Sequence, residues 1–279
     1  MTLADGQVSN TLVVAADPVG VAIDERHRLV FITSTKGQQL SSIDIDSLTV
    51  VKHVEAGGAP LGVTVDSRSG RVYVADWDGA KVRVFNAMTL APRGEYRTGT
   101  TPSGLALTPD GGRLLVANRD ANDVAVIDTV NGLTEARIAV GTAPYGITVS
   151  PNGHYAFVAN VQSDDVTVVD LQTLQPSSTL AVGDMPYASV FDPLRQRLFV
   201  TNHSDGTVSV LDLVDQHEIA HVRVGGYPAG IDMQVEARKV YVVNSMTNDV
   251  TIINADTLAV EGSIKTGDGS RAFGRFILQ

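Results

Sequence analysis

Three local patterns in this chain contain residue types that bind metals or perform acid and base chemistry. His217-Glu218-Ile219-Ala220-His221 matches H-E-x-x-H, in which two histidines one helical turn apart bind zinc and the glutamate acts as a base. Asn118-x-Asp120-x-Asn122 and Asp76-x-Asp78-Gly79 match the opening of a calcium loop, but the remaining ligands are missing. The chain has no cysteine and no G-x-S-x-G elbow, so the sequence does not support a cysteine or serine nucleophile.

A repeat with a period of 42 residues determines how these patterns are interpreted. Proline recurs at this spacing, and in the later copies an asparagine ends an apolar run at the same step. The two sets are Pro18, Pro60, Pro102, Pro144, Pro186 and Pro228, and Asn118, Asn160, Asn202 and Asn244. A fixed period of about 40 to 45 residues with four short β-like segments is typical of one propeller blade. We therefore predict a single all-β domain over residues 1–279, with one four-stranded blade per repeat.

The blade pattern assigns structural roles to most of these motifs. His217 and His221 fall on an outer strand, where residues four apart are separated by roughly 13 Å and cannot share one zinc. The acidic loops are expected to be solvated, so no metal and no cofactor is predicted. The repeated proline and glycine are expected to redirect the chain towards the crowded axis. The recurrent asparagine is expected to hydrogen-bond the backbone of the following loop.

The ends of the second strands resemble the YVTN repeat. The matching segments are Leu115-Val116-Ala117-Asn118, Phe157-Val158-Ala159-Asn160, Phe199-Val200-Thr201-Asn202 and Tyr241-Val242-Val243-Asn244. Each is followed by a run such as Val208-Ser209-Val210-Leu211-Asp212. The resemblance covers nearly the whole chain and implies a seven-bladed propeller, of a kind mostly found in secreted or surface proteins. It also implies diverse functions, since relatives include binding proteins, lactonase-like enzymes and streptogramin-lyase-like enzymes.

Six full repeats leave only residues 1–15 and 271–279 for a closing blade. Gln7 to Val14 is predicted as an outer strand and Arg271 to Leu278 as an inner strand, with no sequence for the strands between them. We therefore predict seven blades with a depleted closing blade, and a six-bladed ring is the alternative. Unpaired edges at that blade would favour strand addition by a partner or dimerisation.

Some positions vary in type while the surrounding scaffold repeats. They flank the repeated proline or follow the second strand, so we expect them on the rim of the central channel. The large and polar ones form the predicted ligand site: Trp77, Arg119, Tyr145, Tyr187, His203, Tyr227 and Arg271. Aromatic rings supply rigid contact area and arginine recognises anions. The alternative is an ordinary surface around a water-filled channel. No catalytic residue is assigned, and His203 is the one candidate base on this rim.

Charge and organisation favour binding over other functions. The net charge of −10 argues against a nucleic-acid partner. The apolar runs are too short to span a membrane, and the first residues lack the pattern of a signal peptide. A periplasmic or extracellular location is expected, with any signal removed. Because the repeats contain no inserted lid or loop, we predict a non-catalytic propeller that holds a small ligand or protein partner at the channel mouth. The alternative is a lyase- or lactonase-like enzyme acting in the central funnel.

Overall fold

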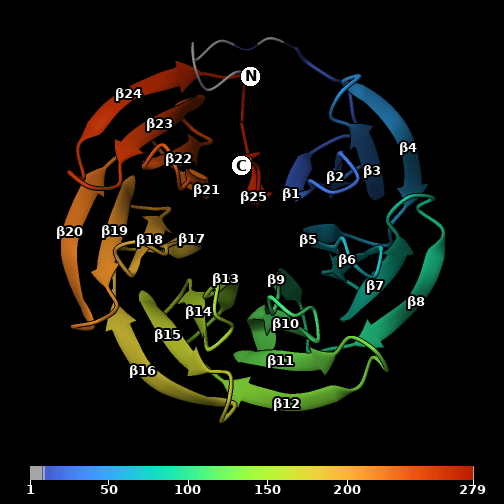
Figure 1. Ribbon diagram of the computed structural model, residues 1–279, viewed down its shortest axis with the longest axis horizontal. Helices are drawn as coiled ribbons and strands as arrows, with labels where there is room; N and C mark the ends of the chain where they lie inside the picture. Colours follow the sequence, from blue (N-terminus) through green and yellow to red (C-terminus); the bar gives the residue numbers. More distant parts are fainter. Residues whose placement is uncertain (1–7, 9, 279) are drawn as a thin grey trace.

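The computed structural model describes residues 8 and 10–278. Six sheets, each built from four consecutive antiparallel strands, surround a central axis as blades (Figure 1). In every blade the chain runs from the axis outwards, so the first strand is the innermost and the fourth is the outermost. The prediction of an all-β propeller with four-stranded blades is confirmed.

The first three blades occupy residues 18–139. Blade 1 consists of β1 (Pro18–Asp24), β2 (Leu29–Ser34), β3 (Gln39–Asp44) and β4 (Thr49–Glu55). Blade 2 consists of β5 (Pro60–Asp66), β6 (Arg71–Asp76), β7 (Lys81–Asn86) and β8 (Pro92–Arg97). Blade 3 consists of β9 (Pro102–Leu107), β10 (Arg113–Asn118), β11 (Asp123–Asp128) and β12 (Thr134–Ala139), with the short 3-10 helix η1 (Arg119–Ala121) between β10 and β11.

The next three blades occupy residues 144–265. Blade 4 consists of β13 (Pro144–Val149), β14 (Tyr155–Asn160), β15 (Asp165–Asp170) and β16 (Gln175–Ala181). Blade 5 consists of β17 (Pro186–Asp192), β18 (Arg197–Asn202), β19 (Thr207–Asp212) and β20 (His217–Arg223). Blade 6 consists of β21 (Pro228–Gln234), β22 (Lys239–Asn244), β23 (Asp249–Asn254) and β24 (Val260–Lys265).

A seventh inner strand, β25 (Phe273–Gly274), lies between blade 6 and blade 1 (Figure 1). It pairs in parallel with β1, so that Gly20 is opposite Phe273 and Val21 is opposite Gly274. Its other neighbour along the ring is β21. Among the described residues this sector contains no further strand, so the closing blade is reduced to its inner strand.

Two expectations about the closing blade need correction. The segment from Gln7 to Val14 was expected to form an outer strand, but residues 8 and 10–14 form none. Residues 1–7 and 9 lie outside the described residues. The inner strand expected from Arg271 to Leu278 is only two residues long. Both results have the same cause. The second and third strands of this blade are missing, so a segment here has no strand of its own blade with which to form backbone hydrogen bonds.

Glycines in the inner strands allow neighbouring blades to meet backbone against backbone. A Cβ atom on Gly62 would lie 2.2 Å from the carbonyl oxygen of Ser103, and one on Gly146 would lie 2.4 Å from that of Tyr187. Proline begins every inner strand from β1 to β21. The structural roles predicted for proline and glycine are therefore confirmed.

The recurrent asparagine is buried and connects two strands of its own blade. Asn160 donates from Nδ2 to Asp165 Oδ1 at 2.6 Å and to Thr167 Oγ1 at 2.9 Å, both on β15. Asn118 also accepts a hydrogen bond from the amide of Gly99, which lies in the segment between β8 and β9. The expected bonds to the following loop are wrong, because the side chain points into the sheet rather than along the chain.

Candidate functional site

The seven predicted rim residues all lie at the end of the ring where the inner strands begin. Trp77 and His203 follow β6 and β18, Arg119 belongs to η1, Tyr145 and Tyr187 are the second residues of β13 and β17, and Tyr227 and Arg271 precede β21 and β25. The repeat geometry therefore gathers positions from five blades and the closing strand on one face. Their ligand-binding role stays a prediction.

Most of these side chains form one continuous row of contacts. Trp77 meets Tyr145 at 6.2 Å between ring centroids in an edge-on arrangement, and Tyr145 meets Tyr187 at 4.1 Å. His203 lies next, 5.2 Å from Tyr187, and stacks on Tyr227 at 4.8 Å with an interplanar angle of 11°. Aromatic pairs at such separations attract one another beyond the burial of their area. The row is therefore a preformed surface.

Tyr145 closes the channel at this end. It is only 7% exposed, and its hydroxyl lies 2.5 Å from the hydroxyl of the half-buried Tyr187. Phe273 packs against both rings, at 5.0 and 5.7 Å, and Val19 and Leu61 belong to the same apolar cluster. At this end of the ring, packed aromatic rings therefore occupy the mouth of the expected channel.

Burial controls the ionisation of the rings. It raises the pKa of Tyr145 well above its usual range and also raises the pKa of Tyr187. It lowers the pKa of His203, and the charge of Arg271 lowers it further. Both tyrosines and the histidine are therefore uncharged near neutral pH, and the histidine presents a flat ring rather than a cation.

Two arginines supply positive charge at the edge of the aromatic surface. The guanidinium carbon of Arg119 lies 5.9 Å from the centre of the Trp77 ring. The same group pairs with Asp120 at 2.6 Å, and Arg271 pairs with Asp17 at 3.5 Å. A guanidinium has five N–H donors, so these ion pairs leave donors for an anionic ligand.

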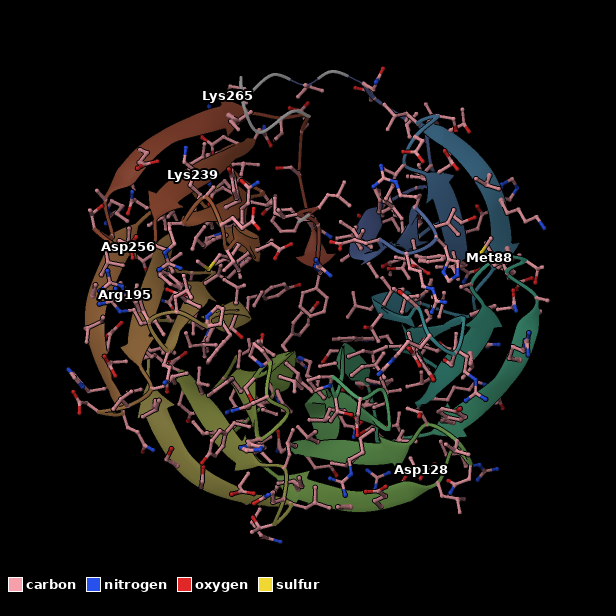
Figure 2. The ribbon with its side chains drawn as sticks, viewed as in Figure 1. Met88, Asp128, Arg195, Lys239, Asp256 and Lys265 are labelled. Atoms are coloured by element: carbon pink, nitrogen blue, oxygen red, sulfur yellow. The ribbon has the colours of Figure 1, made fainter. Side chains whose placement is uncertain are left out.

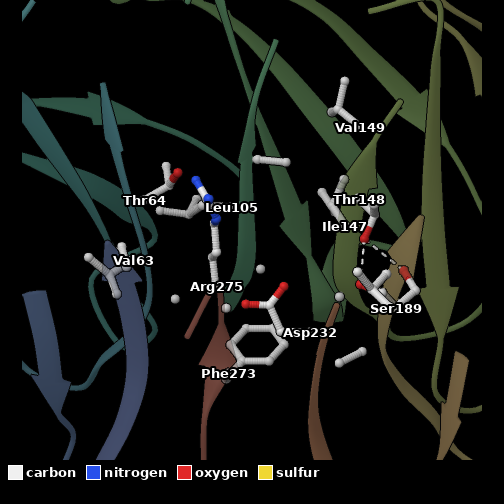
Figure 3. A pocket seen from close by; sticks show the side chains of 18 of the residues that line it. Val63, Thr64, Leu105, Ile147, Thr148, Val149, Ser189, Asp232, Phe273 and Arg275 are labelled. Carbon is white, nitrogen blue, oxygen red and sulfur yellow. Dashed lines mark hydrogen bonds between the residues drawn. The ribbon is translucent and has the colours of Figure 1, made fainter. Parts of the chain in front are cut away.

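A separate cavity of about 380 Å³ lies along the inner strands beyond this cluster (Figure 3). Phe273 is part of its wall, and Asp232 and Arg275 are the charged residues that line it. Asp232 Oδ2 accepts hydrogen bonds from the amides of Phe276 and Ile277 at 2.8 and 2.7 Å, and burial raises the pKa of this carboxyl group. The buried carboxylate therefore fixes the C-terminal segment against blade 6.

The other sequence patterns have internal partners. His217 and His221 lie in the outer strand β20, as predicted. Asp76 is 1% exposed, and its carboxylate accepts hydrogen bonds from the amide of Gly79 and from Arg83 Nε. Within the described residues no group of three or more His, Cys, Asp or Glu could hold a metal ion. In the same part of the chain, no helix is long and apolar enough to cross a membrane.

Sequence reasoning missed Phe273 and Asp232. The repeat contained a signal for the second residue, since its equivalents are Ala22, Thr64, Ala106, Thr148 and Val190, none of which is charged. A single carboxylate at an inner-strand position that is uncharged in the other blades indicates a contact that those blades do not make. Phe273 had no such signal, because the closing strand has no complete repeat around it.

Known proteins share this fold at low sequence identity. A family model described as "Lactonase, 7-bladed beta-propeller" matches residues 85–176, about a third of the chain. No curated protein sequence matches. Among solved structures, hydrazine synthase of Kuenenia stuttgartiensis superposes with a TM-score of 0.85 at 18% identity, covering 95% of this chain and 92% of that one.

Two further structures extend the comparison. A protein from Lactobacillus plantarum has a TM-score of 0.82 at 20% identity, covering 95% of this chain and 89% of that one. The dihydro-heme d1 dehydrogenase NirN, solved in complex with DHE, has a TM-score of 0.72 at 18% identity, covering 91% of this chain and 58% of that one. These likenesses establish the propeller fold alone.

Proposed function

We propose that this protein is a non-catalytic binding propeller that holds a small, flat, anionic molecule on the aromatic surface. The stack of Tyr187, His203 and Tyr227, with Arg271 beside it, carries this proposal. A flat ligand extends such a stack, and a carboxylate would pair with a guanidinium donor. An acidic, aromatic loop of a protein partner would use the same contacts.

The proposal includes a periplasmic or extracellular location, in keeping with the absence of cysteine and the resemblance to exported propellers. The reduced closing blade also supports association with a second copy. In the described residues β25 pairs with one strand only, and an unpaired edge favours strand addition.

A lactonase- or lyase-like activity is the second candidate, and the family match to residues 85–176 favours it. His203 is its candidate base. Among the described side chains, those in ring contact with this imidazole are Tyr187 and Tyr227, and no carboxylate orients it. A general base requires contact with the proton it removes, so this candidate needs a substrate lying on the stack itself. Loss of a measured lactone hydrolysis in His203→Gln would support it.

Fluorescence of Trp77, the single tryptophan, tests the binding proposal. We expect 2-naphthoate to change the emission in a saturable way and the neutral 2-naphthamide to bind more weakly. Arg271→Ala should weaken naphthoate about tenfold, the effect of losing one charge-assisted contact. Arg93→Ala, on the exposed outer strand β8, is the matched control and should change nothing. Equal binding of both probes, or no effect of Arg271→Ala, would contradict the proposal.

A further inference from the structure

An arginine at the start of the second strand connects three pairs of adjacent blades. Arg71 donates to the carbonyl of Thr129, Arg113 to that of Leu171 at 2.9 Å, and Arg197 to that of Ala255 at 3.4 Å. Donor and acceptor are 58 residues apart each time, because the acceptor lies in the turn after the third strand of the next blade. A guanidinium group therefore occupies the same position at each of these three interfaces between blades.

Blade 4 has Tyr155 at this position, 42 residues after Arg113. Its side chain is 41% exposed, and the corresponding acceptor is the carbonyl of Leu213. None of the described residues donates a hydrogen bond to that carbonyl. Blade 1 also lacks the arginine, but there Leu29 is buried and packs in one apolar cluster with Ala87.

A pocket of about 540 Å³ opens where the arginine is missing. Tyr155, Phe157 and Phe191 form an aromatic wall, in which the two phenylalanines are stacked 5.8 Å apart at 16°. The carboxylate of Asp170 and Leu213 also line the pocket, and none of the lining residues is Lys, Arg or His.

The charge of Asp170 is held in place by its own turn. Its Oδ1 accepts hydrogen bonds from the amides of Gln172 and Thr173 at 2.8 and 2.9 Å, and these bonds lower the pKa of the carboxyl group. The pocket therefore combines one fixed negative charge, a free carbonyl acceptor and aromatic faces. Each of these attracts a cation.

We propose that the pocket between blades 4 and 5 binds an organic cation, a guanidinium or amidinium group on a flat apolar body. The charged end takes the position of the inter-blade arginine and donates to the Leu213 carbonyl and Asp170. The apolar body stacks on Tyr155 and Phe191. This site is separate from the aromatic rim and selects ligands of the opposite charge.

Benzamidine is a suitable probe, and the neutral benzamide, which has the same shape, is its control. We expect benzamidine to bind the whole chain saturably in an NMR titration, with shifts confined to residues around Tyr155 and Leu213. Benzamide should bind at least about tenfold more weakly, since it lacks the charge. Equal binding of the two compounds, or no saturable shift, would overturn the proposal.

The Tyr155→Arg variant supplies the missing guanidinium from the chain itself. We expect it to abolish benzamidine binding while melting at the same or a higher temperature. Asp170→Asn keeps an acceptor for the turn amides and should weaken benzamidine about tenfold without unfolding the blade. Val130→Arg, in the exposed turn after β11, is the matched control and should leave binding unchanged. Benzamidine affinity that is insensitive to Asp170→Asn, or that survives in a folded Tyr155→Arg variant, refutes the assignment.

Discussion

The phenolic hydroxyl groups of Tyr145 and Tyr187 lie 2.5 Å apart, although the two residues come from different blades. They occupy the same position in successive repeats, 42 residues apart. Their rings are in contact as well, with centroids 4.1 Å apart. One pair of side chains thus joins two inner strands and closes the channel.

Removing either hydroxyl group should show that the pair acts as a unit. Tyr145→Phe and Tyr187→Phe should each lower the free energy of unfolding by about 1 kcal/mol, the usual net value of one hydrogen bond. The double variant should lose less than the sum, because each single change already removes the bond. Urea unfolding of the four proteins measures the coupling. Additive losses would mean that the hydroxyl groups do not interact.

Truncating the ring of Tyr145 should be far more costly than truncating that of Tyr227. Tyr145 is 7% exposed and Tyr227 is 47% exposed. Tyr145→Ala opens a cavity at the axis and should cost about 3 kcal/mol or more. Tyr227→Ala should cost less than about 1 kcal/mol, since it leaves no buried void. Thermal unfolding of both variants is the measurement, and similar melting temperatures would contradict the closed channel.

Acidification should weaken the fold through His203. Its pKa in the folded protein is below the ordinary value of about 6.5, mainly because of burial and also because of Arg271. Between these two pKa values the unfolded chain binds more protons, so stability falls as the pH is lowered from about 6.5 towards the folded pKa. Wild type should therefore lose more stability than His203→Gln between pH 7.5 and 5.5. Parallel stability curves for the two proteins would disprove this.

The most buried ion pair should matter more than an exposed one. Arg238 binds Asp192 through two hydrogen bonds of 2.7 and 2.6 Å, and the Asp192 side chain is fully buried. Arg238 also contacts Asp256, which lies beside Arg195 at the edge of the ring (Figure 2). Arg238→Ala leaves a buried carboxylate without its cation and should cost about 3 kcal/mol or more.

Arg28 provides the matched control for that variant. It pairs with Asp46 in the exposed turns of blade 1, where water screens the charges. Arg28→Ala should therefore change the urea midpoint much less than Arg238→Ala does. Equal shifts of the midpoint would contradict the structural role of the Asp192 pair.

Asp232 should control the order of the C-terminal segment. Asp232→Ala removes the acceptor of the Phe276 and Ile277 amides, so both amides should exchange hydrogen at least about tenfold faster. Hydrogen exchange followed by NMR measures each amide separately. The amides of β13, on the opposite side of the ring, serve as the internal control. Unchanged exchange at Ile277 would show that other contacts hold the segment.

The repeat made much of the architecture predictable. The constant step of 42 residues predicts that Tyr145 and Tyr187 share one face, because equivalent positions in a closed ring lie on the same side. Trp77 follows a second strand, and that loop is predicted to lie on the same face. The period could not show that Tyr145 points to the axis and fills it, since side-chain direction depends on the packing of neighbouring blades. It also could not show that Asp232 binds the C-terminal segment, because that contact joins a repeat to residues outside the complete repeats.

Packing between blades differs at the sector that contains β25, between blades 6 and 1. Val30 and Ile32 of β2 are half-buried, whereas the equivalent Val72 and Val74 of β6, which face a complete neighbouring blade, are fully buried. Packing between neighbouring blades is therefore weakest beside β25. We expect thermal unfolding to begin there and to extend into blades 6 and 1. Among the described strands, the ring is closed at this sector only by the contacts of β25 with blades 1 and 6. The thermal stability of the whole molecule therefore depends on the few residues that make those contacts.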